Sequence, residues 1–399
     1  MQGDVANNLT VLLLVLVAVI AAWLLGRRSR GGSFRTGRHE LSRDYFIGLN
    51  YLLNDEPDDA IDTFINALEI NSNTLETHMA LGTLLRRRGK VDKSIVVYQS
   101  ILARPRLHEN EINRVKVELI RSYISAGLLD RAERLLTELD SAGADVRRKA
   151  LSLGVILYQQ EKDWENAVAA AMELIRLCPA RERSRYQSMA SHFCCELAEL
   201  AVDQKQYNNA RQRLKKAFQY NRNNVRASML AGHLEMLQGN YREAIKEFLK
   251  VKQQDADFES ETFVQLLECY HASGMEKQLK KFIQQSLEGT PPASVLLGIS
   301  HYIESQSGSR EALQFLLNFL REKPSLKLLN GALDFMSREE GGEIQQNLLL
   351  FHNIIAEYVG NRAMYQCRNC GFEGKSLHWL CPGCSEWGSI KPIKGPIGE

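Results

Sequence analysis

Residues 47–68, IGLNYLLNDEPDDAIDTFINAL, place small and large apolar residues where two short antiparallel helices would pack against each other. These residues are Gly48 and Tyr51 in the first helix, and Ala60, Phe64 and Ala67 in the second. Small residues let neighbouring helices approach closely, and aromatic rings fill the gaps between them. The stretch therefore predicts a helix–turn–helix unit.

The same pattern returns along the chain at spacings from about 34 residues to the low forties, which is typical of tetratricopeptide repeats. Its later copies contain Leu81, Gly82 and Leu85 with Ser94, Tyr98 and Ile101; Tyr123 with Ala132; Tyr158 with Ala167 and Pro179; Ala198 with Ala210 and Ala217; Gly232 with Ala244 and Phe248; Tyr270 with Pro291; and Ala312 with Phe319 and Pro324. We predict about eight repeats over residues 41–325, followed by terminal helices over residues 326–363.

One repeat alone cannot bury its apolar face, so stacked repeats form an all-α, right-handed solenoid with a continuous core and a long concave surface. Such a surface suits a protein or peptide partner. We interpret the repeated motif residues as packing residues, and none of them is assigned to a binding site. The histidines at positions 78, 192, 233 and 271 fall within helical patterns and are likewise interpreted as packed or surface residues.

The run from Leu9 to Leu25, LTVLLLVLVAVIAAWLL, contains no charged residue. As a helix it would rise roughly 26 Å, slightly less than the ~30 Å hydrocarbon thickness of a bilayer. A cleavable signal peptide is the alternative, but the preceding segment carries Asp4 and no lysine or arginine, and no A-x-A cleavage pattern follows. We therefore predict a transmembrane anchor over residues 1–26.

Arginines crowd the segment that follows this run, residues 27–40, which we interpret as a basic tether. They are Arg27, Arg28, Arg30, Arg35 and Arg38, and within this segment no acidic residue precedes Glu40. By the positive-inside rule, the repeats and the C-terminus lie in the cytoplasm. We favour a signal for topology alone over specific recognition of anionic lipids.

The composition of the 399-residue chain, with 44% hydrophobic and 25% charged residues, is that of a folded protein. The net charge of +2 gives no overall bias toward nucleic acid, because proteins that follow phosphates usually carry a strongly basic stripe. Nucleic acid is therefore not an expected partner.

Four of the eight cysteines form the pattern C-x2-C-x10-C-x2-C near the C-terminus: Cys367, Cys370, Cys381 and Cys384. Two residues between cysteines let one tight turn aim both thiolates at a single ion, and two such knuckles complete a tetrahedral shell. We expect Gly371 and Gly383 to ease these turns. Residues 364–399 are therefore predicted to form a rubredoxin-like or zinc-ribbon domain that holds one metal ion, with zinc preferred and iron left open.

Part of the C-terminal pattern also fits a different chemistry. One C-x-x-C pair alone could be a thioredoxin-like redox pair, but that chemistry needs a βαβ setting. We expect Trp379 and Trp387 to cover the small metal cluster, because so short a domain has little other core. An exposed docking surface is the alternative role for these two rings.

No catalytic motif of the HExxH, GxSxG or GxGxxG type stands in the sequence, and a closed four-thiolate site has no open position to activate water. We therefore do not expect an enzyme. Electron transfer through bound iron remains an alternative, because rubredoxins use paired knuckles of this kind.

Several segments together resemble the lipopolysaccharide assembly protein B family over nearly the whole chain. They are the anchor with its following arginines, LSRDYFIGLNYLL at residues 41–53, CRNCGF at 367–372, HWLCPGC at 378–384 and WGSIKPIKG at 387–395. The resemblance implies a regulator in the inner membrane of Gram-negative bacteria that matches supply to demand in lipid A synthesis. It assigns the metal ligands to the four cysteines above and gives no residue of the groove a role.

The resemblance further implies an adaptor that presents the committed-step deacetylase of lipid A synthesis, UDP-3-O-acyl-N-acetylglucosamine deacetylase, to a membrane AAA+ metalloprotease. A further inner-membrane protein that senses lipopolysaccharide would be its third partner. A scaffold for lipopolysaccharide assembly and transport and, less favoured, a membrane-tethered electron carrier stay as alternatives. Whether the chain forms a homodimer is left open.

Overall fold

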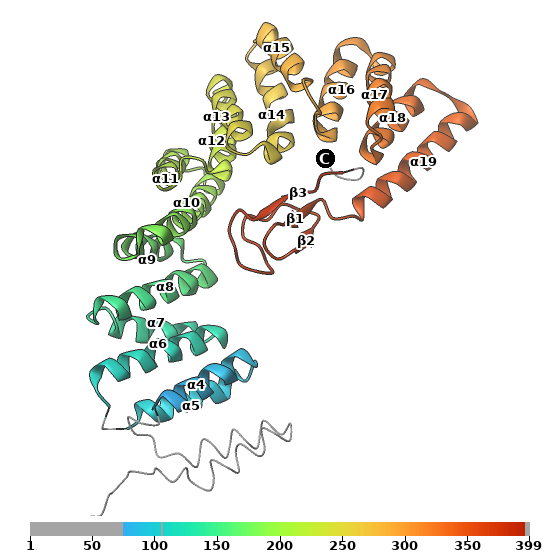
Figure 1. The fold of residues 1–399 in the computed structure, drawn as a ribbon. Coiled ribbons are helices and arrows are strands. Elements are labelled where there is room, and N and C mark those ends of the chain that lie inside the picture. Colours follow the sequence, from blue (N-terminus) through green and yellow to red (C-terminus); the bar gives the residue numbers. More distant parts are fainter. Residues whose placement is uncertain (1–74, 105–106, 396–399) are drawn as a thin grey trace, which may run out of the picture. The chain divides into compact units, whose positions relative to one another are not determined.

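The computed structural model describes residues 75–104 and 107–395, and this part of the chain is mostly helical (Figure 1). It falls into two compact units that divide between Leu107 and His108, and each is described by itself. The predicted anchor, the basic tether and the first repeat, residues 47–68, lie outside the described residues. Among the helices that are described, none combines the length and the hydropathy needed to cross a bilayer.

The first unit contributes one helical pair, α4 (Leu75–Arg87) and α5 (Val91–Leu102). A Cβ atom on Gly82 would lie 2.6 Å from Cζ of Tyr98, so only glycine lets this ring lie against α4. The Ser94 hydroxyl donates a hydrogen bond of 2.8 Å to the Gly82 carbonyl. The small and large positions predicted for this repeat therefore meet as expected.

The second unit continues with helical pairs and ends in a small sheet (Figure 1). The pairs are α6 (Glu109–Ser125) with α7 (Leu129–Glu138), α8 (Ala144–Glu161) with α9 (Trp164–Leu177), α10 (Ala180–Asp203) with α11 (Tyr207–Tyr220), α12 (Val225–Leu237) with α13 (Tyr241–Gln254), α14 (Glu259–Ala272) with α15 (Glu276–Ser286), α16 (Ala293–Ser307) with α17 (Ser309–Glu322), and α18 (Leu326–Glu339) with α19 (Gly342–Gly360). A short 3-10 helix, η2 (Ala256–Phe258), precedes α14.

Small residues at the predicted positions hold these pairs together. A Cβ atom on Gly232 would lie 2.5 Å from Cε1 of Phe248, which repeats the glycine–aromatic contact of the first unit. Alanines at the matching positions of the second helices have no exposed surface: Ala132, Ala167, Ala210, Ala244 and Ala312. The prediction of a tetratricopeptide solenoid is confirmed for the described repeats.

A residue with positive φ lies in the turn between the two helices of most pairs. Four of the turns in the second unit have glycine there, whereas Lys162 (φ 58°) and Lys205 (φ 59°) take the left-handed conformation as ordinary L-residues. Because a left-handed L-residue costs about 1–2 kcal/mol, tight packing of the helices on either side must hold these two turns. The turn is therefore a fixed feature of the repeat, and glycine is only its usual occupant.

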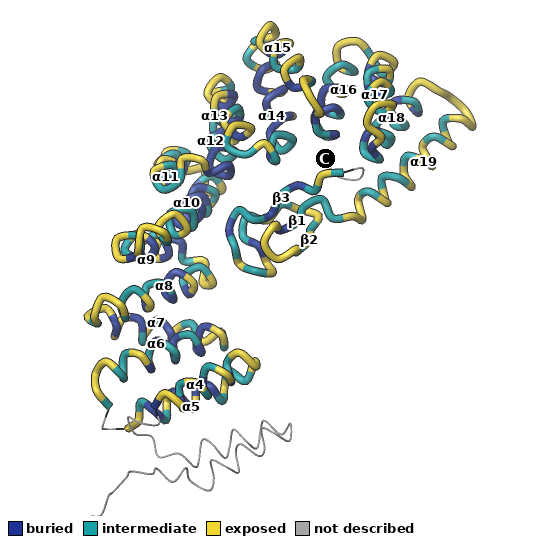
Figure 2. The backbone as a smooth tube through the Cα atoms, in the orientation of Figure 1, coloured by how far each residue is buried: buried dark blue, intermediate teal, exposed yellow. Residues whose placement is uncertain are grey.

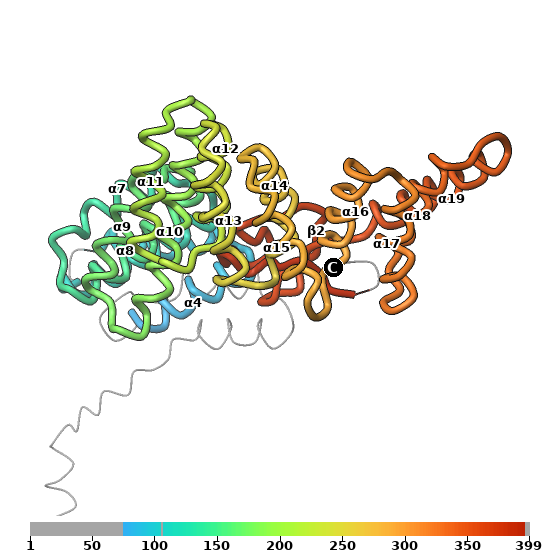
Figure 3. The backbone as a smooth tube through the Cα atoms, turned by 90° about the horizontal axis from the view of Figure 1, so that it is seen from above, coloured from blue at the N-terminus to red at the C-terminus, as the bar shows by residue number. Residues whose placement is uncertain are grey.

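After α19 the chain forms a three-stranded antiparallel sheet in the order β2-β1-β3. The strands are β1 (Tyr365–Cys367), β2 (Glu373–Gly374) and β3 (Ile390–Pro392). Tyr365 of β1 pairs with Gly374 on one side and with Pro392 on the other. In two perpendicular views the sheet lies beside α14 rather than beyond the last helix (Figures 1 and 3).

Candidate metal centre and its contact with the repeats

The structure brings the four predicted cysteines together at one end of the sheet. Their Sγ atoms all lie within 4.8 Å of one another. The Sγ atoms of Cys367 and Cys384 are 3.7 Å apart, and those of Cys370 and Cys381 are 3.6 Å apart. Thiolates about 2.3 Å from a tetrahedral ion lie about 3.8 Å from one another, so this donor set fits one metal ion.

Two backbone turns of the same kind aim these sulfurs. In the first, the Cys367 N–H donates to the Phe372 carbonyl (2.8 Å) and the Gly371 N–H donates to the Cys367 carbonyl (3.0 Å). In the second, the Cys381 N–H donates to the Glu386 carbonyl (3.0 Å) and the Ser385 N–H donates to the Cys381 carbonyl (2.8 Å). Each knuckle is therefore a rigid hydrogen-bonded loop.

The expectation that Gly371 and Gly383 both ease the turns is half correct. Gly371 has φ 78°, but in the second knuckle the left-handed residue is Ser385, with φ 54°. Gly383 serves a different purpose, because a Cβ atom there would lie 3.2 Å from Sγ of Cys370. Its lack of a side chain lets the two knuckles approach each other.

Hydrogen bonds favour the ionised form of one of the four cysteines, Cys367. Burial acts to raise the pKa of Cys367, but bonds with Ser389 and with the backbone of Cys370 and Asn369 outweigh it and lower this pKa to about 6. The pKa of Cys370 moves the other way: the Phe372 N–H lowers it, yet burial and the neighbouring thiols raise it to about 12. Four crowded sulfurs cannot all ionise without a positive ion among them, so their full deprotonation is linked to metal binding.

The side chains of Trp379 and Trp387 contact the repeats, and the prediction that they cover the metal cluster is wrong. Trp387 lies edge-on to Trp164 and Phe193, with ring centroids 6.3 and 5.8 Å apart, and its Nε1 donates to Oε1 of Gln159 (2.9 Å). It belongs to the same buried cluster as the core of α9 and α10. The alternative, an exposed docking surface, does not describe Trp387 either, because this ring is buried against the repeats of its own chain.

The core of the metal domain comes from other residues. Ile390 is buried together with Cys367 and Cys381, and Phe372 and Leu377 pack against them. Trp379 instead stacks on Phe258 of η2, with centroids 5.4 Å apart and an interplanar angle of 23°. Small domains do need extra apolar area, but here the repeats supply it.

Ion pairs border the two tryptophans on the side of the sheet. The ammonium group of Lys391 binds the Asp255 carboxylate, and Nζ of Lys394 lies 2.6 Å from Oδ1 of Asp257. At the opposite edge, the Arg185 guanidinium lies 3.4 Å from the Glu386 carboxylate. The contact between metal domain and repeats thus has an aromatic centre and a charged border, as stable protein interfaces do.

A histidine and an arginine lie beneath Trp387. The ring of His192 stacks on the indole at 5.0 Å with an interplanar angle of 19°, and burial together with the Arg226 charge lowers the pKa of His192 to about 3. Arg226 is 3% exposed and binds the carboxylates of Glu199 and Glu196. Its guanidinium carbon lies 5.8 Å from the centroid of the same indole.

His192, predicted to be either a packed or a surface residue, is packed, and the sequence analysis assigned neither it nor Arg226 a role at this contact. Burial lowers the pKa of Arg226, but the carboxylates of Glu199 and Glu196 outweigh it and raise this pKa. Burying an arginine costs desolvation free energy, which its ion pairs with two carboxylates offset only in part. The two glutamates hold Arg226 in place against the indole of Trp387. The repeat pattern of the sequence does not single out this arginine.

A cleft of about 300 Å³ lies at the other edge of this contact. One wall is formed by α14, α16 and α18, which contribute Glu261, Ser294 and Lys327, and the other by the metal domain, which contributes Tyr365 and Lys375. The Tyr365 hydroxyl donates to the Glu261 carboxylate at 2.8 Å across it. The cleft therefore exists only while the metal domain remains docked on the repeats.

Family models match both parts of the chain. Residues 365–392 match a model described as a rubredoxin metal binding domain, and residues 201–262 match a tetratricopeptide repeat model. Among solved structures, a tetratricopeptide repeat protein from Parabacteroides merdae shares 15% identity, covering 71% of this chain and all of that one. The TM-score of that match is 0.33.

Curated relatives match almost from end to end. Lipopolysaccharide assembly protein B of Escherichia coli K12 is 32% identical over 97% of this chain and 98% of its own length. The protein of the same name from Haemophilus influenzae is 29% identical over 96% of this chain and 97% of its own. With 32% identity across nearly the whole of both chains, the chain belongs to the lipopolysaccharide assembly protein B family.

Proposed function

We propose that this chain is a membrane-anchored adaptor that regulates lipid A synthesis by presenting the committed-step deacetylase of that pathway to a membrane AAA+ metalloprotease. The relatives carry the name of an assembly protein, and tetratricopeptide repeats bind proteins rather than transform substrates. The deacetylase, the protease and a lipopolysaccharide-sensing membrane protein are its proposed partners.

The observation that supports this proposal most is the cleft between the metal domain and the repeats. Polar groups from both parts line it, among them Lys327 of α18 and Lys375 of the metal domain. A partner segment that entered it would contact both parts at once. The metal ion then serves binding indirectly, because it keeps one wall of the cleft folded.

The ligands of that ion are proposed to be Cys367, Cys370, Cys381 and Cys384, with zinc as the ion. Four thiolates fill a tetrahedral shell, so a structural role suits the site. Replacement of Cys367 and Cys384 by serine should remove the metal from the purified full-length chain. Unchanged metal content would show that the ligands are assigned incorrectly.

The anchor is part of the proposal, since an adaptor that shares a membrane with the protease meets it at a high local concentration. Residues Leu9 to Leu25 are proposed to span the inner membrane with the repeats in the cytoplasm. A C-terminal alkaline phosphatase fusion should then be inactive. An active fusion, or a mature chain that begins after Trp23, would exclude this topology.

The decisive measurement is the half-life of the lipid A deacetylase in cells. Deletion of the gene for this chain should lengthen that half-life, and the full-length chain should restore it. Exchange of both Lys327 and Lys375 for glutamate should restore it poorly, whereas Lys280 and Lys281 on α15, exposed and away from the cleft, can be exchanged as a control. A normal half-life in the deletion strain would overturn the adaptor and leave a scaffold for lipopolysaccharide assembly.

Electron transfer is the second candidate, because the Cys370 side chain is exposed and would bring a bound iron within reach of a redox partner. Absorbance separates the two candidates. A colourless protein with one zinc per chain would exclude the electron carrier, and a red iron centre with a measurable reduction potential would favour it.

A further inference from the structure

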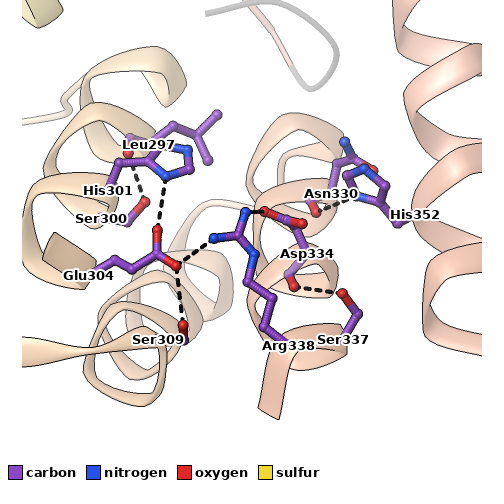
Figure 4. Close-up of polar contacts among 10 residues, drawn as sticks. All are labelled: Leu297, Ser300, His301, Glu304, Ser309, Asn330, Asp334, Ser337, Arg338 and His352. Atoms are coloured by element: carbon purple, nitrogen blue, oxygen red, sulfur yellow. Dashed lines mark hydrogen bonds and ion pairs between the residues drawn. The ribbon is translucent and has the colours of Figure 1, made fainter. Parts of the chain in front are cut away.

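Helix α19, the last helix before the metal domain, is fixed to the repeats along one side only. The His352 Nδ1–H donates to the Asn330 carbonyl of α18 (3.2 Å), and Gln345 Nε2 donates to the Ser337 carbonyl (3.0 Å). Figure 4 shows the His352 contact beside the Arg338 guanidinium, which joins Asp334 of α18 to Glu304 of α16. The helix on which α19 rests is therefore itself held in place.

The outer side of α19 is apolar and uncovered within the described part of the chain. No residue of α19 is buried, and the helix carries no dark blue in Figure 2. The exposed large apolar residues of α19 are Ile344 (58%), Leu349 (39%), Leu350 (56%), Phe351 (56%), Ile354 (54%) and Tyr358 (46%). A row of large apolar side chains on one helix is a common mark of an interaction site.

The spacing of the exposed residues along α19 indicates that another helix is the fitting partner. Ile344, Asn347, Phe351, Ile354 and Tyr358 follow one another at alternating steps of three and four residues. That is the a/d pattern of a coiled coil, whose side chains insert between those of another helix. A single polar residue on such a seam, here Asn347, favours one register over others.

We propose that the seam of α19, defined as Ile344, Asn347, Phe351, Ile354 and Tyr358, pairs antiparallel with the same seam of a second copy of this chain. Three glutamates lie around the start of α19: Glu339 ends α18, Glu340 lies in the short connection that follows it, and Glu343 lies in the first turn of α19. Arg362 lies just beyond the end of α19. Antiparallel pairing brings Glu340 of one copy toward Arg362 of the other, and opposes the helix dipoles favourably. Parallel pairing would instead gather six glutamates at one end.

A twofold axis through the midpoint of the seam places Phe351 against Phe351 of the other copy, and Ile344 near Tyr358. The half-exposed apolar side chains amount to roughly 500 Å² per copy, or ~1,000 Å² for the pair, at the lower end of specific interfaces. We therefore expect a reversible dimer. A lipid surface fits less well, because the flanking charges of α19 are mainly acidic.

Cysteine cross-linking of the full-length chain in detergent tests both the contact and its direction. Phe351→Cys should link to itself through a short bismaleimide. Ile344→Cys should not link to itself but should link to Tyr358→Cys when the two variants are mixed. Asn353→Cys is the control, because position 353 is exposed on α19 but lies off the seam. The unsubstituted chain measures background from Cys370, which is also exposed.

Each outcome decides the proposal. Failure of Phe351→Cys to link above the Asn353→Cys level would overturn the dimer, and self-linking of Ile344→Cys would show parallel pairing. A photo-cross-linking residue at position 351 identifies any other occupant: links to residues 1–74 of the same chain, to lipid or to a different protein would each overturn the proposal.

Charge exchange gives an independent measurement of the antiparallel register. Glu340→Arg and Arg362→Glu should each weaken dimerisation about four- to twenty-five-fold, because one exposed ion pair contributes about two- to five-fold and the twofold axis repeats the pair. The chain that carries both changes should dimerise more tightly than either single variant, since it restores the pair with the charges reversed, although the contact of Arg362 with Tyr358 is lost. If the two losses simply added in the double variant, the antiparallel register would be wrong.

Discussion

The metal domain and helix α19 are neighbours in the sequence, yet they meet the repeats in opposite ways. The metal domain buries Trp387 among Trp164, Phe193 and His192 and surrounds that contact with ion pairs. Helix α19 rests on α18 through hydrogen bonds and directs its apolar side chains outward. Large apolar side chains are covered within the chain in the first case and exposed in the second.

This difference separates stability from association. Changes at the Trp387 contact should lower the free energy of unfolding, because truncation of a buried ring loses its burial and leaves a cavity. Changes on the α19 seam should alter association and leave folding nearly unchanged. The four predictions below test that separation, beginning with the largest effect.

Metal removal should have the largest effect. It should destabilise the metal domain and its contact with the repeats, but not α19. Without the ion, the four thiols lose the charge that holds the knuckles together, and a domain this small has too little core to remain folded. Hydrogen exchange of the full-length chain should then accelerate over residues 365–392 and over α10. Exchange in α18 and α19 should change little, and equal acceleration there would show that the two contacts are not independent.

Truncation of one buried and one exposed aromatic residue should give very different losses of stability. Trp387→Ala should lower the free energy of unfolding of the metal-loaded chain by about 3–5 kcal/mol, as expected for a buried ring. Phe351→Ala, its matched control on α19, should change the stability of the monomer by less than about 0.5 kcal/mol. Urea unfolding followed by circular dichroism measures both. Similar losses would remove the distinction.

Acid should weaken the Trp387 contact through His192. Burial and Arg226 lower the pKa of His192 to about 3 in the folded chain, against 6.5 for the ordinary group. Between these values only the unfolded state takes up the proton, so stability falls as the pH drops below about 6.5. From pH 7.5 to 5 the loss should be about 2 kcal/mol. His192→Phe should keep the stacking and remove that part of the pH dependence.

Metal release in acid also lowers stability, so the test compares slopes. Wild type and His192→Phe share the thiolate contribution, and the difference between their stability-versus-pH curves isolates the histidine. Parallel curves between pH 7.5 and 5 would show that His192 does not titrate with unfolding. The stability-versus-pH curves of wild type and of His192→Phe are both measured on chains that start with the metal bound.

Local spacing predicted the repeats and the cysteine cluster, because both depend on contacts between residues close in sequence. Gly82 and Tyr98 meet 16 residues apart, and the two knuckles are each four residues long. The partners of Trp387 were not predictable in this way, since its indole N–H reaches Gln159, 228 residues earlier. Nor does sequence distinguish the apolar residues of α19 from core residues: their spacing is that of a packed helix, and only the structure leaves them uncovered.

The smallest expected effect is a gain in stability from Ser385→Gly within the metal domain. Ser385 has φ 54°, and a left-handed L-residue costs about 1–2 kcal/mol, whereas glycine costs about 0.4–1 kcal/mol through the greater freedom of the unfolded chain. The net gain should be about 0.5–1 kcal/mol, measured as slower metal release to a chelator. Gly371→Ala is the mirror-image control in the first knuckle, with φ 78°, and should speed release. Neither change reaches α19, so dimerisation should stay constant. Faster release from Ser385→Gly would mean that the serine side chain contributes to the knuckle beyond its backbone conformation.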